Sequence, residues 1–153
     1  MNQIDPKMAA QVWQRVRPTP EDAPLPPEAG LLELIAREWE AAGTYLQLSR
    51  RYTGNVHQQF HKLFLREQAH TACLKGIYTL ITGKKPTVAP APHLTGQTPN
   101  YLRKCYGEAM HQLHQYEKRT DDPEYGHVFA RIAQQEREHC MALLGLIGSL
   151  GTK

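Results

Sequence analysis

A short motif of glutamate and histidine is repeated in this chain of 153 residues, and the repeat restricts the fold more than any other feature. Glu67 and His70 are three residues apart, as are Glu136 and His139, and 69 positions separate the two pairs. Residues three apart lie one turn from each other on nearly the same side of an α-helix. On a helix, each pair can therefore direct a carboxylate and an imidazole into the same space.

A lone glutamate precedes each pair at a matching distance. Glu38 lies 29 residues before Glu67, and Glu108 lies 28 residues before Glu136. In an antiparallel helical hairpin, residues equidistant from the turn lie at the same height, so the turn should fall midway between the two glutamates. The midpoints, at 52.5 and 122, both coincide with turn signals in the sequence. This agreement predicts two hairpins whose ligands lie at one level.

Apolar residues at helical spacing predict four long helices between about residues 27 and 151. Proline, glycine and asparagine supply the start and stop signals. The expected boundaries are a first helix from about Pro27 to the turn at residues 53–55, a second from Asn55 to Gly83, a third from Thr98-Pro99, and a fourth from Asp122-Pro123 to near Gly151.

The second and third helices are joined by residues 84–97, a Pro-rich stretch without expected secondary structure. About 14 extended residues reach roughly 46 to 50 Å, which exceeds the length of roughly 38 Å for a helix of about 25 residues. The connection can therefore run the length of a bundle. We predict an all-α protein: a ferritin-like four-helix bundle over residues 27–151, made of two antiparallel hairpins joined by a long crossover loop.

Residues 1–26 are expected to form an N-terminal extension that combines a short helix with a Pro-rich linker. The apolar side of that short helix suits packing on the bundle or on a neighbouring subunit, but it equally suits a frayed terminus. The sequence leaves these two interpretations open.

The predicted site combines four carboxylates with two imidazoles. Two divalent cations would balance four ionised glutamates, which removes much of the cost of burying their charges. Carboxylate and imidazole ligands suit iron, and they also suit manganese. We therefore predict a centre with two iron ions, or two manganese ions, bound by Glu38, Glu67, His70, Glu108, Glu136 and His139. A further Glu-x-x-His pair, Glu124 and His127, lies far from this level and is expected to be structural.

These positions, together with the pattern Glu38-x-x-Ala41-x-x-x-Tyr45, resemble the rubrerythrin type of ferritin-like diiron protein over residues of about 28–150. The resemblance implies a reduced iron pair that reacts with peroxide or dioxygen in oxidative-stress defence, in a homodimer or larger assembly. It also implies that Tyr45 lies next to the ligands as a proton or hydrogen-bond donor. A separate electron donor, such as a rubredoxin-like protein, is expected because the chain lacks a Cys-rich rubredoxin segment.

Two positions depart from the family pattern. Where the family has a second carboxylate three residues after the third-helix glutamate, this chain has His111. Three roles for His111 remain open: a seventh ligand, a base beside the ligands, or a hydrogen-bonded core histidine. The residue that repeats Tyr45 is Gln115, with Tyr116 displaced by one position, so the two halves of the site are expected to differ.

Charge and cysteine content narrow the remaining classes of function. The formal net charge is +3, and paired basic residues fall near expected helix ends, which argues against nucleic-acid binding. Three cysteines without Cys-x-x-Cys spacing predict neither a disulfide framework nor a thiolate metal site. Without a signal peptide or a membrane-length apolar run, a cytoplasmic protein without membrane contact is expected. An iron-storage protein and a metal-stabilised interaction bundle without turnover remain alternatives.

Overall fold

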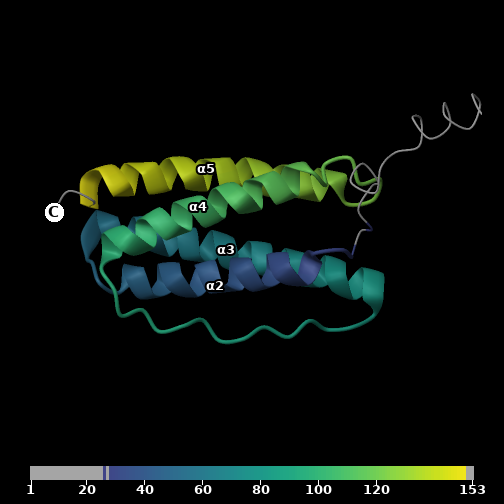
Figure 1. The fold of residues 1–153 in the computed structure, drawn as a ribbon, viewed down its shortest axis with the longest axis horizontal. Helices are drawn as coiled ribbons and strands as arrows, with labels where there is room; N and C mark the ends of the chain where they lie inside the picture. Colours follow the sequence, from purple (N-terminus) through teal and green to yellow (C-terminus); the bar gives the residue numbers. More distant parts are fainter. Residues whose placement is uncertain (1–25, 27, 151–153) are drawn as a thin grey trace, which may run out of the picture.

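The computed structural model describes residue 26 and residues 28–150, and this part of the chain folds into four α-helices without a strand (Figure 1). Most of the predicted N-terminal extension, residues 1–26, lies outside the described residues. None of the described helices is both long enough and apolar enough to cross a membrane. The helices are α2 (Leu31–Ser49), α3 (Gly54–Thr82), α4 (Thr98–Glu117) and α5 (Gly126–Leu150).

The helices pair into two hairpins, α2 with α3 and α4 with α5. Between the hairpins, α2 lies beside α4 and α3 lies beside α5, so that neighbouring helices around the bundle are antiparallel (Figure 1). The core is divided into two apolar clusters. One contains Ile35, Leu74 and Phe129, and the other contains Phe60 and Leu143. The buried polar side chains described below lie between these clusters.

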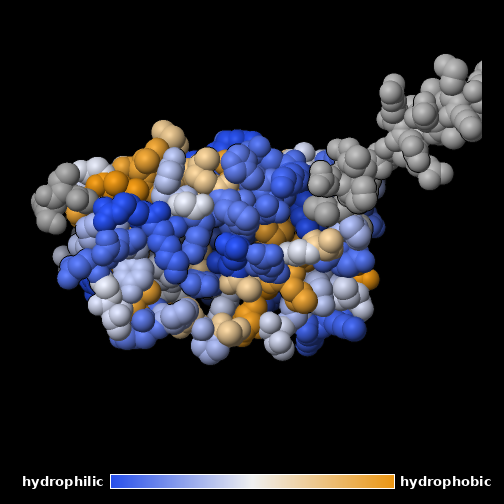
Figure 2. Space-filling view, viewed as in Figure 1, coloured by the Kyte–Doolittle hydropathy of each residue, from blue (hydrophilic) through white to orange (hydrophobic). Residues whose placement is uncertain are grey.

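The outer surface is mostly hydrophilic on the face shown in Figure 2, whereas apolar residues gather toward the C-terminal end of α5. Met141 and Leu144 on α5 are 70% and 45% exposed. The described bundle thus has the polar exterior and apolar interior expected of amphipathic helices.

The helix ends follow the predicted turns closely, with two differences. Gly83 ends α3 in the left-handed conformation, with φ 72°, as predicted. The first helix begins at Leu31 rather than near Pro27, after a turn that ends at Gly30. The last helix begins at Gly126, one turn after residues 122–123. In the turn that leads into it, the Asp122 carboxylate accepts hydrogen bonds from the backbone N–H groups of residues 124 and 125, which are the contacts of the predicted start signal.

Residues 83–97 run along the bundle from the end of α3 to the start of α4 (Figure 1). Gln47 on α2 makes two hydrogen bonds to the backbone of this connection. Its Nε2 donates to the Pro92 carbonyl at 2.9 Å, and its Oε1 accepts from the Leu94 N–H at 2.9 Å. Arg51 donates to the Gly96 carbonyl at 2.8 Å. The connection is therefore bound by hydrogen bonds to α2 and to Arg51, which follows that helix.

We expect Gly43→Ala to destabilise the protein by about 1 to 3 kcal/mol, the usual cost of overpacking. A Cβ at residue 43 would overlap the Cβ of Ala91 and would force the connection away from α2. Gly76→Ala is the matched control, because a Cβ there meets nothing within 4 Å and should stabilise α3 by about 0.5 to 1 kcal/mol. Urea denaturation of both variants measures the difference, and equal effects of the two substitutions would contradict the packing described here.

Candidate metal centre

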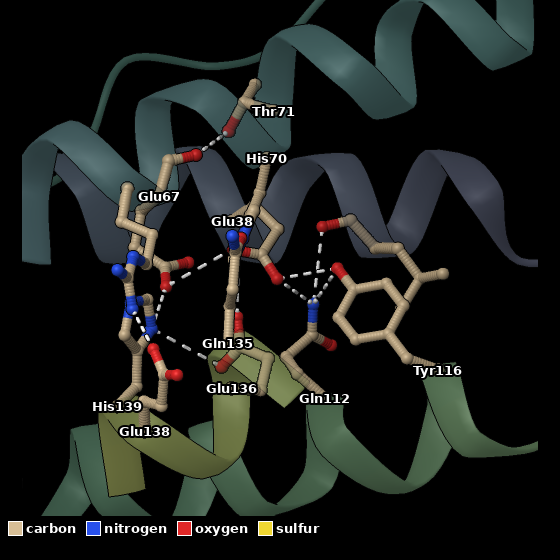
Figure 3. Close-up of polar contacts among 12 residues, drawn as sticks. Glu38, Glu67, His70, Thr71, Gln112, Tyr116, Gln135, Glu136, Glu138 and His139 are labelled. Atoms are coloured by element: carbon tan, nitrogen blue, oxygen red, sulfur yellow. Dashed lines mark hydrogen bonds and ion pairs between the residues drawn. The ribbon is translucent and has the colours of Figure 1, made fainter. Parts of the chain in front are cut away.

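Five buried ionisable side chains meet between the two apolar clusters (Figure 3). They come from three helices: Glu38 from α2, Glu67 and His70 from α3, and Glu136 and His139 from α5. Each is between 1% and 3% exposed. Burial of so many ionisable groups is costly unless partners or a metal ion compensate for it.

Four atoms of this group converge. The Nδ1 atom of His70 lies 3.6 Å from Oε2 of Glu38 and 3.9 Å from Oε1 of Glu67. The same Nδ1 lies 3.3 Å from Oε1 of Glu136. All four atoms are buried, and among the described residues none of them has a hydrogen-bond partner outside this group of five side chains. Atoms that bind one ion at about 2.0 to 2.2 Å are roughly 3 to 4 Å apart, so a metal ion fits this set and would satisfy all four atoms.

Two carboxylates of the group lie between two imidazoles. Oε1 of Glu67 contacts Nδ1 of His139 as well as facing His70. Oε1 of Glu136 faces His70, and its Oε2 lies 3.6 Å from Nδ1 of His139. The centroids of the two imidazole rings are 5.7 Å apart. Carboxylates placed between two imidazoles in this way can bridge two ions.

Within the part of the chain that the structure describes, one cluster of histidine, cysteine and acidic side chains has the spacing of a metal site. It consists of Glu38, Glu67, His70 and Glu136. No family model, curated protein or solved structure matches this chain. The interpretation therefore rests on the donor set itself, in which hard carboxylates and imidazole favour iron, manganese or zinc.

The orientation of His70 is set by a residue that the sequence had not identified. Nε2 of His70 lies 2.6 Å from Oε1 of Gln135, a side-chain oxygen that can only accept a hydrogen bond. Nε2 of His70 therefore carries a proton, and Nδ1, which faces the carboxylates, is the nitrogen that can bind a metal ion once it has lost its own proton. The sequence did hold a signal for this role: Gln135 lies four residues before His139, so it is one helical turn away and faces the same side of the helix.

Two residues of α4 hold the Glu38 carboxylate in place by hydrogen bonds. The Tyr116 hydroxyl donates to Oε1 of Glu38 at 2.5 Å, and Nε2 of Gln112 donates to the same oxygen at 3.2 Å (Figure 3). Both side chains are buried. One carboxylate oxygen of Glu38 is thus held by hydrogen bonds, and the other is left for a metal ion.

Glu108, the predicted ligand from α4, does not lie among the converging atoms. It is half-buried, and its Oε1 lies 3.9 Å from Nζ of Lys104, a largely exposed side chain. The buried face of α4 includes Ala109, which lies about 100° further around the helix than Glu108. Glu108 is therefore at the edge of the buried face, although it lies at the predicted level along the bundle, near Glu38 and Glu67.

Helix α4 contributes Tyr116 to the site, whereas the sequence had indicated Tyr45 as the tyrosine beside the ligands. Tyr116 follows Ala109 by seven residues, just as Tyr45 follows Glu38 by seven. Both tyrosines are buried, which makes Tyr116, rather than Gln115, the structural counterpart of Tyr45. Ala109 consequently occupies the place that corresponds to Glu38, so the two halves of the site differ by one carboxylate.

The other two sequence candidates lie outside the ligand cluster. Tyr45 is beside the thiol of Cys105, and burial, followed by the charges of Cys105 and Glu136, raises the pKa of Tyr45 well above its usual value. His111 is exposed and lines a surface cavity together with Arg37. This exposure contradicts the core-histidine interpretation of His111.

The pKa values of the buried groups are shifted in different directions, so the groups differ in how readily they hold a proton. Burial and the charge of Glu136 raise the pKa of Glu38 to about 7. Burial also opposes ionisation of Glu136, but His139 and His70 outweigh it and lower that pKa to about 2. Burial would lower the pKa of His70, yet Glu136 and Glu38 raise it to about 10. At neutral pH a metal ion must therefore displace a proton from His70.

We expect Gln135→Leu to weaken the binding of one metal ion by about 10- to 100-fold and to leave the binding of the other nearly unchanged, because loss of the hydrogen bond to a ligating histidine has effects of this size. Leucine has a similar volume but cannot accept the Nε2–H of His70. Competition with a chromophoric chelator measures both affinities. Gln134→Leu, at an exposed neighbouring position, is the matched control; equal weakening of both ions would contradict the assignment.

Proposed function

We propose that this chain binds two metal ions between its hairpins, with iron as the native metal, and that it reduces hydrogen peroxide or dioxygen. The proposal places the chain with ferritin-like proteins of the rubrerythrin type, and the long connection along α2 supports that topology. The observation that carries it is the convergence of four buried ligand atoms, none of which has a hydrogen-bond partner outside the site among the described residues. A bound pair of ferrous ions would supply the two electrons that peroxide needs.

The ligand roles follow from the contacts. Glu38 and His70 would hold one ion, and His139 would hold the other. Glu67 and Glu136 would be shared between them, because each faces both imidazoles. This set leaves the second ion with fewer ligands than the first.

Glu108 remains the predicted sixth ligand. It lines a small cavity that also borders Glu38, Glu67 and Glu136, so the carboxylate and the ligand cluster share one space. Its pKa is raised by burial, while Lys104 acts in the opposite direction. Competition with a chelator in Glu108→Gln tests this role, because loss of a ligand should lower the affinity of the second ion by more than the 10- to 100-fold that loss of a partner behind a ligand causes.

The dimensions of that cavity restrict the reactant. Its volume is about 10 Å³, which is room for about one water molecule. Reactants with only a few atoms, such as peroxide or dioxygen, therefore suit the site better than organic substrates do. Reduction of peroxide to two water molecules consumes two electrons and two protons. Tyr116 keeps its proton at the edge of the site, because burial and the charge of Glu38 raise its pKa well above the usual value.

The test uses protein loaded without oxygen with two ferrous ions per chain. Hydrogen peroxide should oxidise the bound iron faster than free ferrous iron, with one peroxide consumed per pair of ions. Fast oxidation that persists unchanged in Glu67→Gln would show that the site is not responsible. Oxidation no faster than that of free iron would remove the enzymatic proposal. A dimer in sedimentation would exclude the storage alternative, which needs a hollow shell.

A structural metal centre is the second candidate, and the nearly complete burial of the ligands favours it. In that case the ions would join α2 and α3 to α5 without turnover. Zinc would then stabilise the protein as well as iron does, and peroxide would not be consumed. Thermal unfolding with each metal, combined with the peroxide measurement, separates the two candidates.

A further inference from the structure

The small cavity that borders the ligands, called the inner cavity below, has a neighbour that opens at the surface. This outer cavity has a volume of about 180 Å³ and is bounded by α2, by α4 and by residues 92–94 of the connection. Cys105 and Glu108 line both cavities, so these two side chains form the partition between them. Glu40 and Lys104 line the outer cavity alone, and their side chains are 45% and 58% exposed.

Small side chains leave room for the inner cavity. Ala41 on α2 and Ala109 on α4 line it, and Ala109 occupies the place that corresponds to Glu38 in the other hairpin. Its other walls include the ligands Glu67 and Glu136. Each of these two has a buried carboxylate oxygen with no hydrogen-bond partner outside the site among the described residues. The two cavities together lead from the surface to carboxylates that can still bind a cation.

The lining of the outer cavity is negatively charged. Glu40 and Glu108 contribute two negative charges and Lys104 contributes one positive charge, so the net charge is about −1. Nζ of Lys104 lies 3.7 Å from Oε1 of Glu40 and 3.9 Å from Oε1 of Glu108. A cation therefore already lies between the two carboxylates. It belongs to a largely exposed side chain, which can move away when another cation arrives.

The cavity on the opposite side of the site, between α3 and α5, has the opposite charge. Lys62 and Arg66 contribute two positive charges to its lining and Glu138 contributes one negative charge, so the net charge there is about +1. His139 also lines this cavity, but both of its ring nitrogens are buried. A metal ion is therefore attracted to the outer cavity between α2 and α4 and repelled from the cavity between α3 and α5.

We propose that divalent metal ions enter the site between α2 and α4, beneath residues 92–94, and that Lys104 controls this passage. Until an ion arrives, the Lys104 ammonium offsets the repulsion between Glu40 and Glu108. The incoming ion displaces the ammonium from the two carboxylates, and Glu108 then passes the ion across the partition to Glu67. The inference rests on the proposed function, because a route requires a metal site at its end.

The experiment uses the full chain and cobalt(II), whose visible absorption changes when carboxylate and imidazole ligands bind it. Stopped-flow absorption measures the rate of uptake, excess chelator measures the rate of release, and titration counts the bound ions. Glu40→Gln removes a negative charge from the outer cavity, so uptake should slow by about three- to tenfold at low ionic strength. Release should slow equally, because Glu40 lies on the route and away from the bound ions. Concentrated salt should shrink the difference.

Glu138→Gln is the matched control, because it removes the same charge from a side chain that is 52% exposed in the cavity between α3 and α5. It should leave the rate of uptake unchanged. Lys104→Gln removes the competing ammonium and should speed uptake several-fold. Lys62→Gln removes the same charge from the cavity between α3 and α5 and should not speed it.

A change of shape without a change of charge is an independent test. Thr44→Leu puts a larger apolar side chain in the wall of the outer cavity and removes a hydroxyl that donates to the Glu40 carbonyl within α2. Uptake and release should both slow, with the affinity unchanged. Ala142→Leu enlarges a side chain in the wall of the cavity between α3 and α5 and should leave both rates unchanged.

Three results would overturn the inference: equal uptake by the unmodified chain and Glu40→Gln, equal slowing by Glu40→Gln and Glu138→Gln, or slowing by Glu138→Gln alone. The last of these would place the entry between α3 and α5. If cobalt does not bind, the proposed function fails together with the inference. If two cobalt ions bind at rates that depend on neither Glu40 nor Lys104, the inference alone fails.

Discussion

Glu67→Gln is expected to remove both metal ions, with each affinity lowered by at least about 100-fold. This carboxylate faces both imidazoles, so its loss affects both metal positions. The effect should exceed the loss of about 10- to 100-fold that follows when a hydrogen-bond partner of a ligand is removed, because here the ligand itself is lost. Glutamine keeps the size of the side chain but lacks the negative charge that offsets a divalent ion.

Elemental analysis after dialysis measures this result, and competition with a chelator gives the affinities. Glu117→Gln is the matched control, because Glu117 is an exposed carboxylate on α4 whose only ion pair in the described structure is with Arg137. The control should retain the full metal content. If Glu67→Gln kept one ion at unchanged affinity, the carboxylate could not be shared between two metal positions.

The metal-free protein should lose stability as the pH rises from about 5 to 8. The folded-state pKa of Glu38, about 7, lies above its ordinary value of 4.5, so its contribution is present at low pH and is lost as the pH rises through 7. His70, with a pKa of about 10 instead of 6.5, loses its contribution as the pH rises from 6.5 through 10. The loss from Glu38 amounts to roughly 2 to 3 kcal/mol.

Glu136 does not offset this loss. Its pKa of about 2 lies below the ordinary 4.5, so its contribution is complete above about pH 5 and is lost only as the pH falls through 2. Metal loading should reverse the trend, because metal binding releases the protons of Glu38 and His70 and becomes stronger as the pH rises. The stabilisation by metal should therefore grow between pH 5 and 8.

Thermal unfolding measures both trends, in a chelator for the metal-free protein and with excess zinc for the loaded protein. A change of 2 to 3 kcal/mol corresponds to roughly 10 °C for a domain of this size. Glu38→Gln should make the metal-free profile less steep, because the amide does not titrate and still accepts from Tyr116, while His70 continues to titrate. Metal-free stability that rises over this pH range would contradict the site electrostatics.

The positions of the hairpin turns could be predicted from sequence because several independent signals agree there. The turn between α2 and α3 lies at the midpoint between Glu38 and Glu67, and Gly83 ends α3 as expected. The inward direction of His70 and Glu136 followed from the three-residue spacing of each pair. These features depend on local helix geometry, which is regular.

The contribution of α4 could not be predicted in the same way. Equal distance from a turn fixes the height of a residue but not the side of the helix on which it lies. One residue of register rotates a helix by about 100°, which is enough to move Glu108 to the edge and to bring Ala109 inward. Gln112 and Tyr116 were missed for the same reason. Gln135 was missed because its role depends on a contact between helices.

The most direct measurement of the central claim is the number of metal ions held by the intact chain. The protein is loaded with ferrous iron without oxygen, dialysed and analysed for iron and protein, and crystals are then examined for anomalous scattering. We predict two ions per chain, both adjacent to Glu67 and Glu136, one beside His70 and the other beside His139. Protein that retains no iron, or iron located away from these residues, would contradict it.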